Sequence, residues 1–286
     1  MLITFAIAGL IFSQLLSVPI WYMLTGKSAG EIQAAMLDPQ YSNISKLTQA
    51  LSQVGGFLLP TIITAWLIHK KPLVLLGFRG RISGEQVGLT FLIIIAALFL
   101  AASLSLITHL LPISPDLQLR FEKLEAEYSR QVQAIVRLNS FGDFLLALGV
   151  MAFIPALCEE ALFRGGLQNF LTRGTSKPWM SIILVSILFS LAHWSFYGFL
   201  SRFVLGMVLG ALYYYSGRLW ISILAHFVNN GIALTIVYIY TRQGKPVAEA
   251  MSEGPESFWG LMTVPVLIVL LIHFRRISHR GLQRPY

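Results

Sequence analysis

The chain of 286 residues has few charged side chains and a single cysteine. Charged residues make up 12% of the sequence, half of the ~25% that is usual for soluble domains. Hydrophobic residues reach 56%, which leaves too little polar surface to cover a soluble core of this size. The composition therefore excludes a soluble enzyme, a disordered chain and a coiled coil, and it predicts a polytopic membrane protein.

The lone cysteine, Cys158, excludes a disulfide within the chain and a cysteine-rich zinc site. Several protease motifs are also missing: there is no rhomboid-like GxSG, no presenilin-like GxGD and no HExxH pair. Cys158 itself is interpreted as a small buried hydrophobe and not as a nucleophile. The net charge of +8 lies mostly in short loops and the C-terminal tail, where it indicates contact with anionic lipid headgroups and not with nucleic acid.

Apolar stretches recur along the whole chain. A spanning helix needs roughly 20 apolar residues, because the hydrocarbon core of a bilayer is about 30 Å thick. Such stretches predict an all-α bundle of about eight transmembrane helices in one membrane domain, 1–286, with spans at 2–24, 47–68, 87–111, 144–158, 178–201, 203–217, 219–241 and 257–274. A polar stretch, 116–143, is expected to form an amphipathic excursion.

Loop charges predict the orientation of the chain. Basic residues crowd the loop after the second span and the tail, among them Arg79, Arg81, Arg280 and Arg284. Because cytoplasmic loops carry an excess of Lys and Arg, both termini are expected in the cytoplasm. In a bacterium, the membrane that holds the chain would be the plasma membrane.

Ionisable residues gather in the second half of the predicted bundle. An Arg, Lys or Asp at the centre of a spanning helix costs about 2.5–3.5 kcal/mol, so such residues usually face the bundle interior and serve a function. Here they are Glu159, Glu160, Arg164, His193 and His226. At α-helical spacing Glu160 and Arg164 share a face and can pair, while Glu159 points elsewhere.

Two further pairs follow the same spacing. Phe189 lies one turn before His193 and can support its ring, and Asn230 lies one turn after His226. A shielded carboxylate can act as a general base, and a histidine can orient water or move its proton. A second histidine and an amide can donate hydrogen bonds to a developing oxyanion. These groups are the parts of peptide-bond hydrolysis without a protein nucleophile.

Three motifs carry these residues: EExxxR at 159–164, FxxxH at 189–193 and HxxxN at 226–230. Their order on separate helices resembles the CPBP family, the CAAX-protease and bacteriocin-processing group (also called Abi), which includes prenyl-protein endopeptidases of the Rce1 type. The resemblance covers about 144–241. It implies an intramembrane endopeptidase acting on a membrane-associated or lipidated, CAAX-like protein or peptide.

The resemblance also implies roles for the motif residues. Glu159 would activate water with the help of His193, His226 and Asn230 would stabilise the oxyanion, and Glu160, Arg164 and Phe189 would support the site. No cofactor is required in this interpretation. Zinc stays open, because Glu159, His193 and His226 are ligands of the right type for a catalytic zinc with an open position and the family is commonly labelled metalloprotease.

Other interpretations of the same residues remain. Glu160 and Arg164 alone could be a structural ion pair, and Trp194 could line a substrate groove or pack against lipid. A non-catalytic membrane scaffold or immunity protein of the same family is the second function. A proton-coupled transporter using Glu159 and His193 is the third, although the sequence shows no internal repeat.

Overall fold

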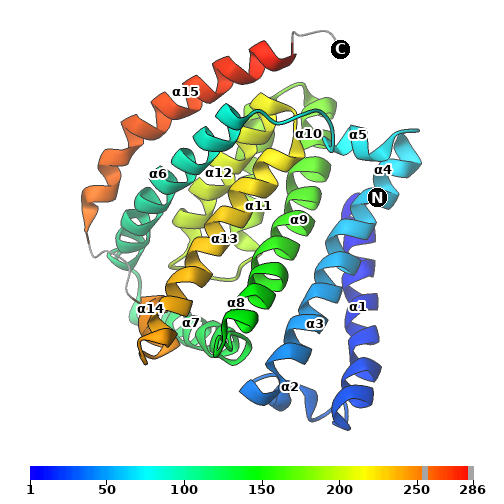
Figure 1. Ribbon diagram of the computed structural model, residues 1–286, viewed down its shortest axis with the longest axis vertical. Helices are drawn as coiled ribbons and strands as arrows, with labels where there is room; N and C mark the ends of the chain where they lie inside the picture. Colours follow the sequence, from blue (N-terminus) through cyan, green and yellow to red (C-terminus); the bar gives the residue numbers. More distant parts are fainter. Residues whose placement is uncertain (253–256, 283–286) are drawn as a thin grey trace. The chain divides into compact units, whose positions relative to one another are not determined.

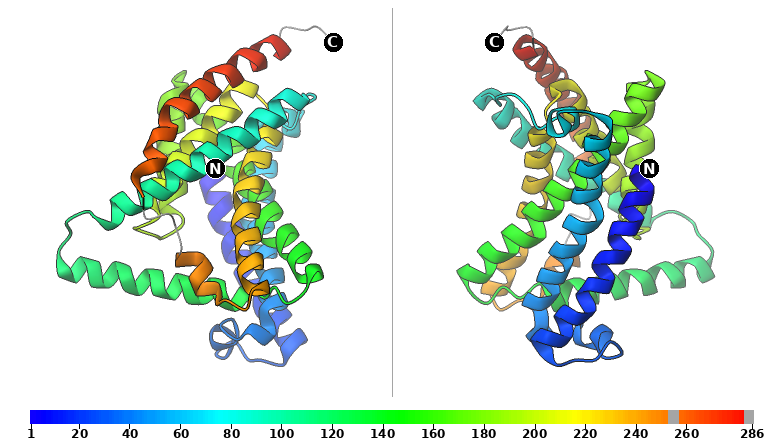
Figure 2. Two further views of the ribbon diagram at one scale, coloured as in Figure 1. Left: turned by 60° about the vertical axis from the view of Figure 1, so that its left-hand side comes forward. Right: turned by 90° about the vertical axis from the view of Figure 1, so that its right-hand side faces the viewer.

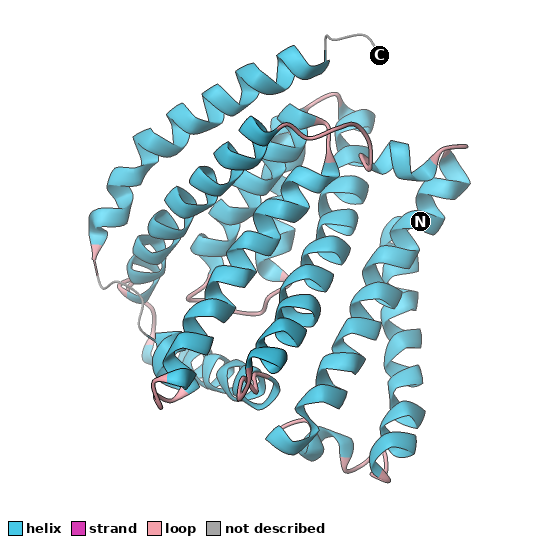
Figure 3. Ribbon diagram, viewed as in Figure 1, coloured by secondary structure: helices cyan, strands magenta, loops and turns pink. Residues whose placement is uncertain are grey.

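The computed structural model describes residues 1–252 and 257–282, and Figure 1 shows their course. This part of the chain is helical throughout and holds no strand (Figure 3). Within it, seven helices are long and apolar enough to cross a bilayer, so the chain is an integral, multi-pass membrane protein. Arg284, part of the predicted basic tail, lies outside the described residues.

The membrane-length helices agree roughly with the predicted bundle of about eight. Continuous helical segments run over Leu2–Thr25, Pro39–Ile68, Gly84–His109, Phe141–Thr175, Phe199–Ser216, Leu219–Arg242 and Phe258–Ser278. The predicted fifth span, 178–201, is different. Its helix α11 (Pro178–Leu191) has only 14 residues, and a turn separates it from α12 (Phe199–Ser216). The predicted excursion forms most of the polar helix α7 (Pro115–Ile135).

Two compact units make up the chain, and each draws on separate stretches of sequence. The first comprises the described residues of Met1–Pro72, Ala126–Leu162 and Asn230–Glu253. The second comprises those of Leu73–Glu125, Phe163–Asn229 and Gly254–Tyr286.

The first unit contains α1 (Leu2–Thr25) and two long composite helices, the first of which packs against α1. One consists of η1 (Pro39–Tyr41), α3 (Ser42–Gln53), η2 (Val54–Leu58) and α4 (Leu59–Ile68); the other begins with α8 (Phe141–Ala147), η3 (Leu148–Phe153) and α9 (Ile154–Glu160). Helix α1 approaches η2 closely because Gly9 and Gly55 face each other. A Cβ atom on Gly9 would collide with the carbonyl oxygen of Gly55.

Two prolines explain why these composite helices are not α-helical throughout. Pro60 and Pro155 lie inside them and have no N–H to donate to the carbonyl four residues earlier, with which their rings also clash. Each proline follows a π-helical segment, Val54–Leu58 in one case and Leu148–Phe153 in the other. The wider turn accommodates the proline within a continuous helix. Such π segments frequently occur at functional sites.

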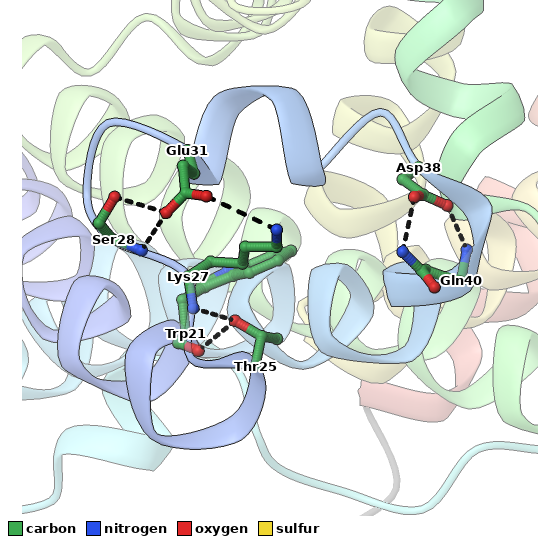
Figure 4. Close-up of polar contacts among 7 residues, drawn as sticks. All are labelled: Trp21, Thr25, Lys27, Ser28, Glu31, Asp38 and Gln40. Carbon is green, nitrogen blue, oxygen red and sulfur yellow. Dashed lines mark hydrogen bonds and ion pairs between the residues drawn. The ribbon is translucent and has the colours of Figure 1, made fainter.

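A compact loop joins α1 to the composite helix that follows it (Figure 4). The buried Trp21 packs with Ile32 of α2 (Ile32–Ala35) and meets the Tyr41 ring edge-on at 5.9 Å. In the loop, Ser28 donates backbone and side-chain hydrogen bonds of 2.9 and 2.7 Å to Glu31. These bonds hold the pKa of the exposed Glu31 carboxyl below its usual value.

The second unit contains α6 (Gly84–His109), α11, α12 and α15 (Thr263–Leu282). It also includes the short helices α5 (Pro72–Leu76) and α10 (Asn169–Thr175). Figure 2 shows α15 running beside α6. Buried polar groups also connect the helices. Gln86 of α6 donates to Ser278 of α15 over 3.1 Å and accepts over 3.2 Å from Arg218, which follows α12. Its membrane-length helices are therefore joined by satisfied hydrogen bonds as well as by apolar packing.

Candidate functional site

Both glutamates of the EExxxR motif lie in the middle of a long helix. The predicted fourth span ended just before them, but the helix continues from Phe141 to Thr175. Glu159 and Glu160 close α9, where Glu159 is 9% exposed and Glu160 is fully buried. Burying a carboxylate is costly unless it is hydrogen-bonded or paired, so the partners of these groups decide what they can do.

Glu159 has one partner that the sequence analysis missed. The side-chain amide of Gln53, at the end of α3, donates to Oε1 of Glu159 over 3.1 Å. The other oxygen, Oε2, is buried and has no hydrogen-bond partner among the described residues. Gln53 therefore orients one oxygen of the carboxylate, while the other oxygen can still accept a proton or a hydrogen bond. An amide in an otherwise apolar span was the signal that could have found Gln53.

Phe189 organises the other predicted residues within the second unit. Its buried ring meets those of His193 at 4.8 Å and His226 at 5.7 Å, both edge-on. The guanidinium carbon of Arg164 lies 4.6 Å from the ring centroid, within cation–π range. Phe163 completes the cluster at 5.3 Å. The structure thus brings Arg164, His193 and His226 together around one aromatic ring, and Phe189 is in contact with His193 as the spacing predicted.

His193 does not lie within a helix, contrary to the prediction. Helix α11 ends at Leu191, and His193 occupies the turn that follows. Its Nδ1 lies 2.7 Å from the carbonyl oxygen of Phe189. Because a carbonyl only accepts, Nδ1 carries a proton, and in the neutral form of this tautomer Nε2 is the acceptor. That tautomer suits a group that receives a proton or orients water.

Arg164 is fully buried in the π-helical segment η4 (Ala161–Gln168). Its Nη2 donates to the carbonyl of Gly206 in α12 over 3.2 Å, and one turn later Gln168 donates to the carbonyl of Gly210 over 2.9 Å. The two bonds form successive connections between η4 and α12. Arg164 is thus held by a backbone carbonyl and an aromatic ring, while its pairing with Glu160 stays a prediction.

The HxxxN motif lies on the continuous helix α13 (Leu219–Arg242). His226 is buried and Asn230 is half-buried. Residues four apart project from the same side of an α-helix, so the imidazole and the amide lie in neighbouring turns of α13.

The zinc interpretation gains no support from the fold. Among the described residues, no group of three or more His, Cys, Asp or Glu side chains is arranged to hold a metal ion. A metalloprotease class is therefore not supported by the described residues.

Comparison with known proteins places one segment in a family. No curated protein and no solved structure matches the chain. Residues 141–232 match the family model described as type II CAAX prenyl endopeptidase Rce1-like. The matched segment contains all three motifs. Through this segment, which is about a third of the chain, the protein is similar to the Rce1-like CAAX prenyl endopeptidases.

Proposed function

We propose that the chain is an intramembrane endopeptidase that hydrolyses a peptide bond near the membrane surface. The substrate is a membrane-associated or lipidated, CAAX-like protein or peptide. The Rce1-like match and the seven membrane-length helices support this function. No nucleic acid takes part, and the enclosing membrane in a bacterium is the plasma membrane with both termini in the cytoplasm.

The observation that supports this proposal most directly is the environment of Glu159. Its Oε1 is held by Gln53 and its buried Oε2 lacks a hydrogen-bond partner among the described residues. A carboxylate in this state can take a proton from water as the water oxygen attacks the carbonyl carbon of the scissile peptide. The same proton is then delivered to the nitrogen of the leaving amine as the carbon–nitrogen bond breaks.

The remaining motif residues serve the two ends of this reaction. His193 presents Nε2, which orients the attacking water. His226 and Asn230 donate hydrogen bonds to the oxyanion that forms on the substrate carbonyl. Glu160, Arg164 and Phe189 support the arrangement without touching the reacting atoms. No metal or other cofactor is needed for these steps.

The experiment is cleavage of a lipidated and unlipidated peptide library by purified protein. Glu159→Gln is expected to lower turnover by about 10²–10⁴-fold, because the amide is isosteric but cannot accept the proton. Cys158→Ser, at the neighbouring buried position, is the matched control and keeps turnover. Near wild-type cleavage by Glu159→Gln would exclude the general-base role.

A further inference from the structure

The turn that carries His193, residues 192–198, is held from outside by α6 and α7. The Ser195 hydroxyl donates a hydrogen bond to the Glu125 carboxylate on α7 and accepts one of 3.0 Å from the backbone N–H of Gly198. Phe196 stacks on Phe121 of α7 at 4.1 Å, with the rings 1° from parallel. Three consecutive residues of the turn, 195–197, are thereby fixed, since Tyr197 also stacks on a ring of α6.

That last contact involves the end of α6. The Tyr197 ring lies 3.9 Å from the ring of His109, the final residue of α6, and the two are 4° from parallel. Ser190, near the end of α11, donates to the carbonyl of Phe199 over 2.7 Å. The base of the turn is thus closed by a hydrogen bond, and its far side is held by two stacked ring pairs and one carboxylate.

The backbone of the turn needs such contacts. Trp194 has φ +52°, a left-handed conformation that non-glycine residues rarely adopt and that persists only when the surroundings impose it. The indole is 84% exposed, so its own packing does not impose the conformation. The contacts of residues 195–197 are the ones available to do so, and His193 is directly attached to Trp194.

Helix α7 is suited to holding the 192–198 turn, because it contributes little to the packing of the bundle. Of its 21 residues only Ala134 is buried, so α7 contributes almost nothing to the apolar core. Phe121 and Glu125 are one helical turn apart and share the face that meets the turn. The polar helix therefore presents the ring of Phe121 and the carboxylate of Glu125 to the segment that carries His193.

We propose, on the basis of the hydrolase function above, that Glu125 is a positioning residue: through Ser195 it holds the 192–198 turn and thereby sets the imidazole of His193. Phe189 orients this ring from inside the bundle, and the Glu125–Ser195 hydrogen bond fixes the backbone that follows it. Because a shift of 1 Å in a reacting group can cost about 10²-fold in rate, the turn needs both restraints.

Steady-state kinetics test the catalytic consequence. Glu125→Ala is expected to lower kcat about tenfold with KM unchanged, since it acts on the geometry of the water and not on substrate binding. Glu125→Gln retains most of kcat, because its amide oxygen still accepts from Ser195. Ser195→Ala matches Glu125→Ala, and the double variant is no slower than either single variant. Glu127→Ala, an equal change of charge at an exposed position of α7, is the control.

A spin label tests the turn without any turnover. In a Cys158→Ser background, a nitroxide on Ala192→Cys is expected to be immobilised in the parent, Glu125→Gln and Glu127→Ala proteins, and mobile in Glu125→Ala and Ser195→Ala. Unchanged mobility in Glu125→Ala overturns the positioning role, whatever kcat does. An equal loss of kcat in Glu125→Gln and Glu125→Ala also overturns it, because charge would then matter and the hydrogen bond would not. Full turnover by Glu159→Gln would instead exclude the general-base role, absence of cleavage by the parent protein would exclude the proposed function, and the spin label would still decide whether Glu125 holds the turn.

Discussion

The surroundings of Glu159 and of Phe189 differ in the number of side chains that pack on the central group. Around Phe189, a cation, two imidazoles and a second aromatic ring pack on one buried side chain, and Arg164 and His193 each bond a backbone carbonyl. Around Glu159, the carboxylate has one amide donor and one buried oxygen without a hydrogen-bond partner in the described part of the chain.

The difference separates stability from chemistry. A cluster of packed buried rings with a hydrogen-bonded charge lowers the free energy of the folded state and fixes geometry. An unsatisfied buried acceptor costs free energy, and proteins keep such groups where they do chemistry. The Phe189 cluster is therefore expected to respond to mutation mainly through stability, and the Glu159 environment mainly through activity.

The largest effect on stability is expected from Phe189→Ala. Removing the ring takes away the common partner of Arg164, His193 and His226 and leaves a cavity in the core. Loss of a buried Phe side chain typically costs about 3–5 kcal/mol. Thermal unfolding in detergent should show a large fall in Tm together with loss of turnover. The control is Leu188→Ala on the same helix, whose side chain is exposed and should change Tm little. Equal Tm values for the two variants would refute the central role of Phe189.

A smaller loss is expected from Arg164→Ala. The substitution removes the hydrogen bond to Gly206 and the cation over Phe189, and hydrogen bonds to charged groups contribute about 1.5–3 kcal/mol. Arg164→Lys should recover only part of the loss, because an ammonium does not reproduce the planar guanidinium. Unfolding midpoints of both variants would be compared with Arg173→Ala, which removes an exposed arginine on the same long helix. An Arg164→Ala protein as stable as Arg173→Ala would show that the buried contacts contribute nothing.

The smallest effect on stability is expected from Gln53→Leu. The change removes the only donor seen for Glu159 within the described residues, and it also removes the buried Oε1 of Gln53, which has no hydrogen-bond partner there. The loss of the hydrogen bond and the removal of the unsatisfied oxygen offset each other, so the free energy of unfolding should change by less than about 1 kcal/mol. Turnover should nevertheless fall about tenfold, because the carboxylate is no longer oriented. Ser52→Ala on the same helix is the control. A large Tm loss without a loss of turnover would reverse the assignment of the two regions.

Much of the fold, and the motif residues, could be predicted from the sequence. Apolar length predicted the membrane helices, and helical spacing predicted that Phe189 supports His193. Both rest on local periodicity, which a single sequence contains. Contacts between distant segments were not accessible in the same way. Gln53 precedes Glu159 by 106 residues, and Glu125 precedes Ser195 by 70, so no spacing rule connects them.

The helix boundaries were wrong where the backbone departs from the α-helix. Charge at Glu159 suggested the end of a span, yet Gln53, Arg164 and the continued helix keep the motif within it. Conversely, the apolar run after Leu191 suggested a continued helix, but the left-handed residue Trp194 stops it. Hydropathy alone reports neither the partners of a buried charge nor a single backbone dihedral angle.

The π-helical segment Leu148–Phe153 also acts as a phase shift in the helix that carries Glu159. Each π turn takes in one residue more than an α turn, and one residue corresponds to about 100° of rotation in an α-helix. Deleting one residue from this segment would return the helix to regular phase and turn Glu159 away from Gln53 by a little more than a quarter of a revolution. In an evolutionary comparison, a one-residue gap at this place would therefore mark a change in the direction of the carboxylate, even where the EExxxR letters themselves were unaltered.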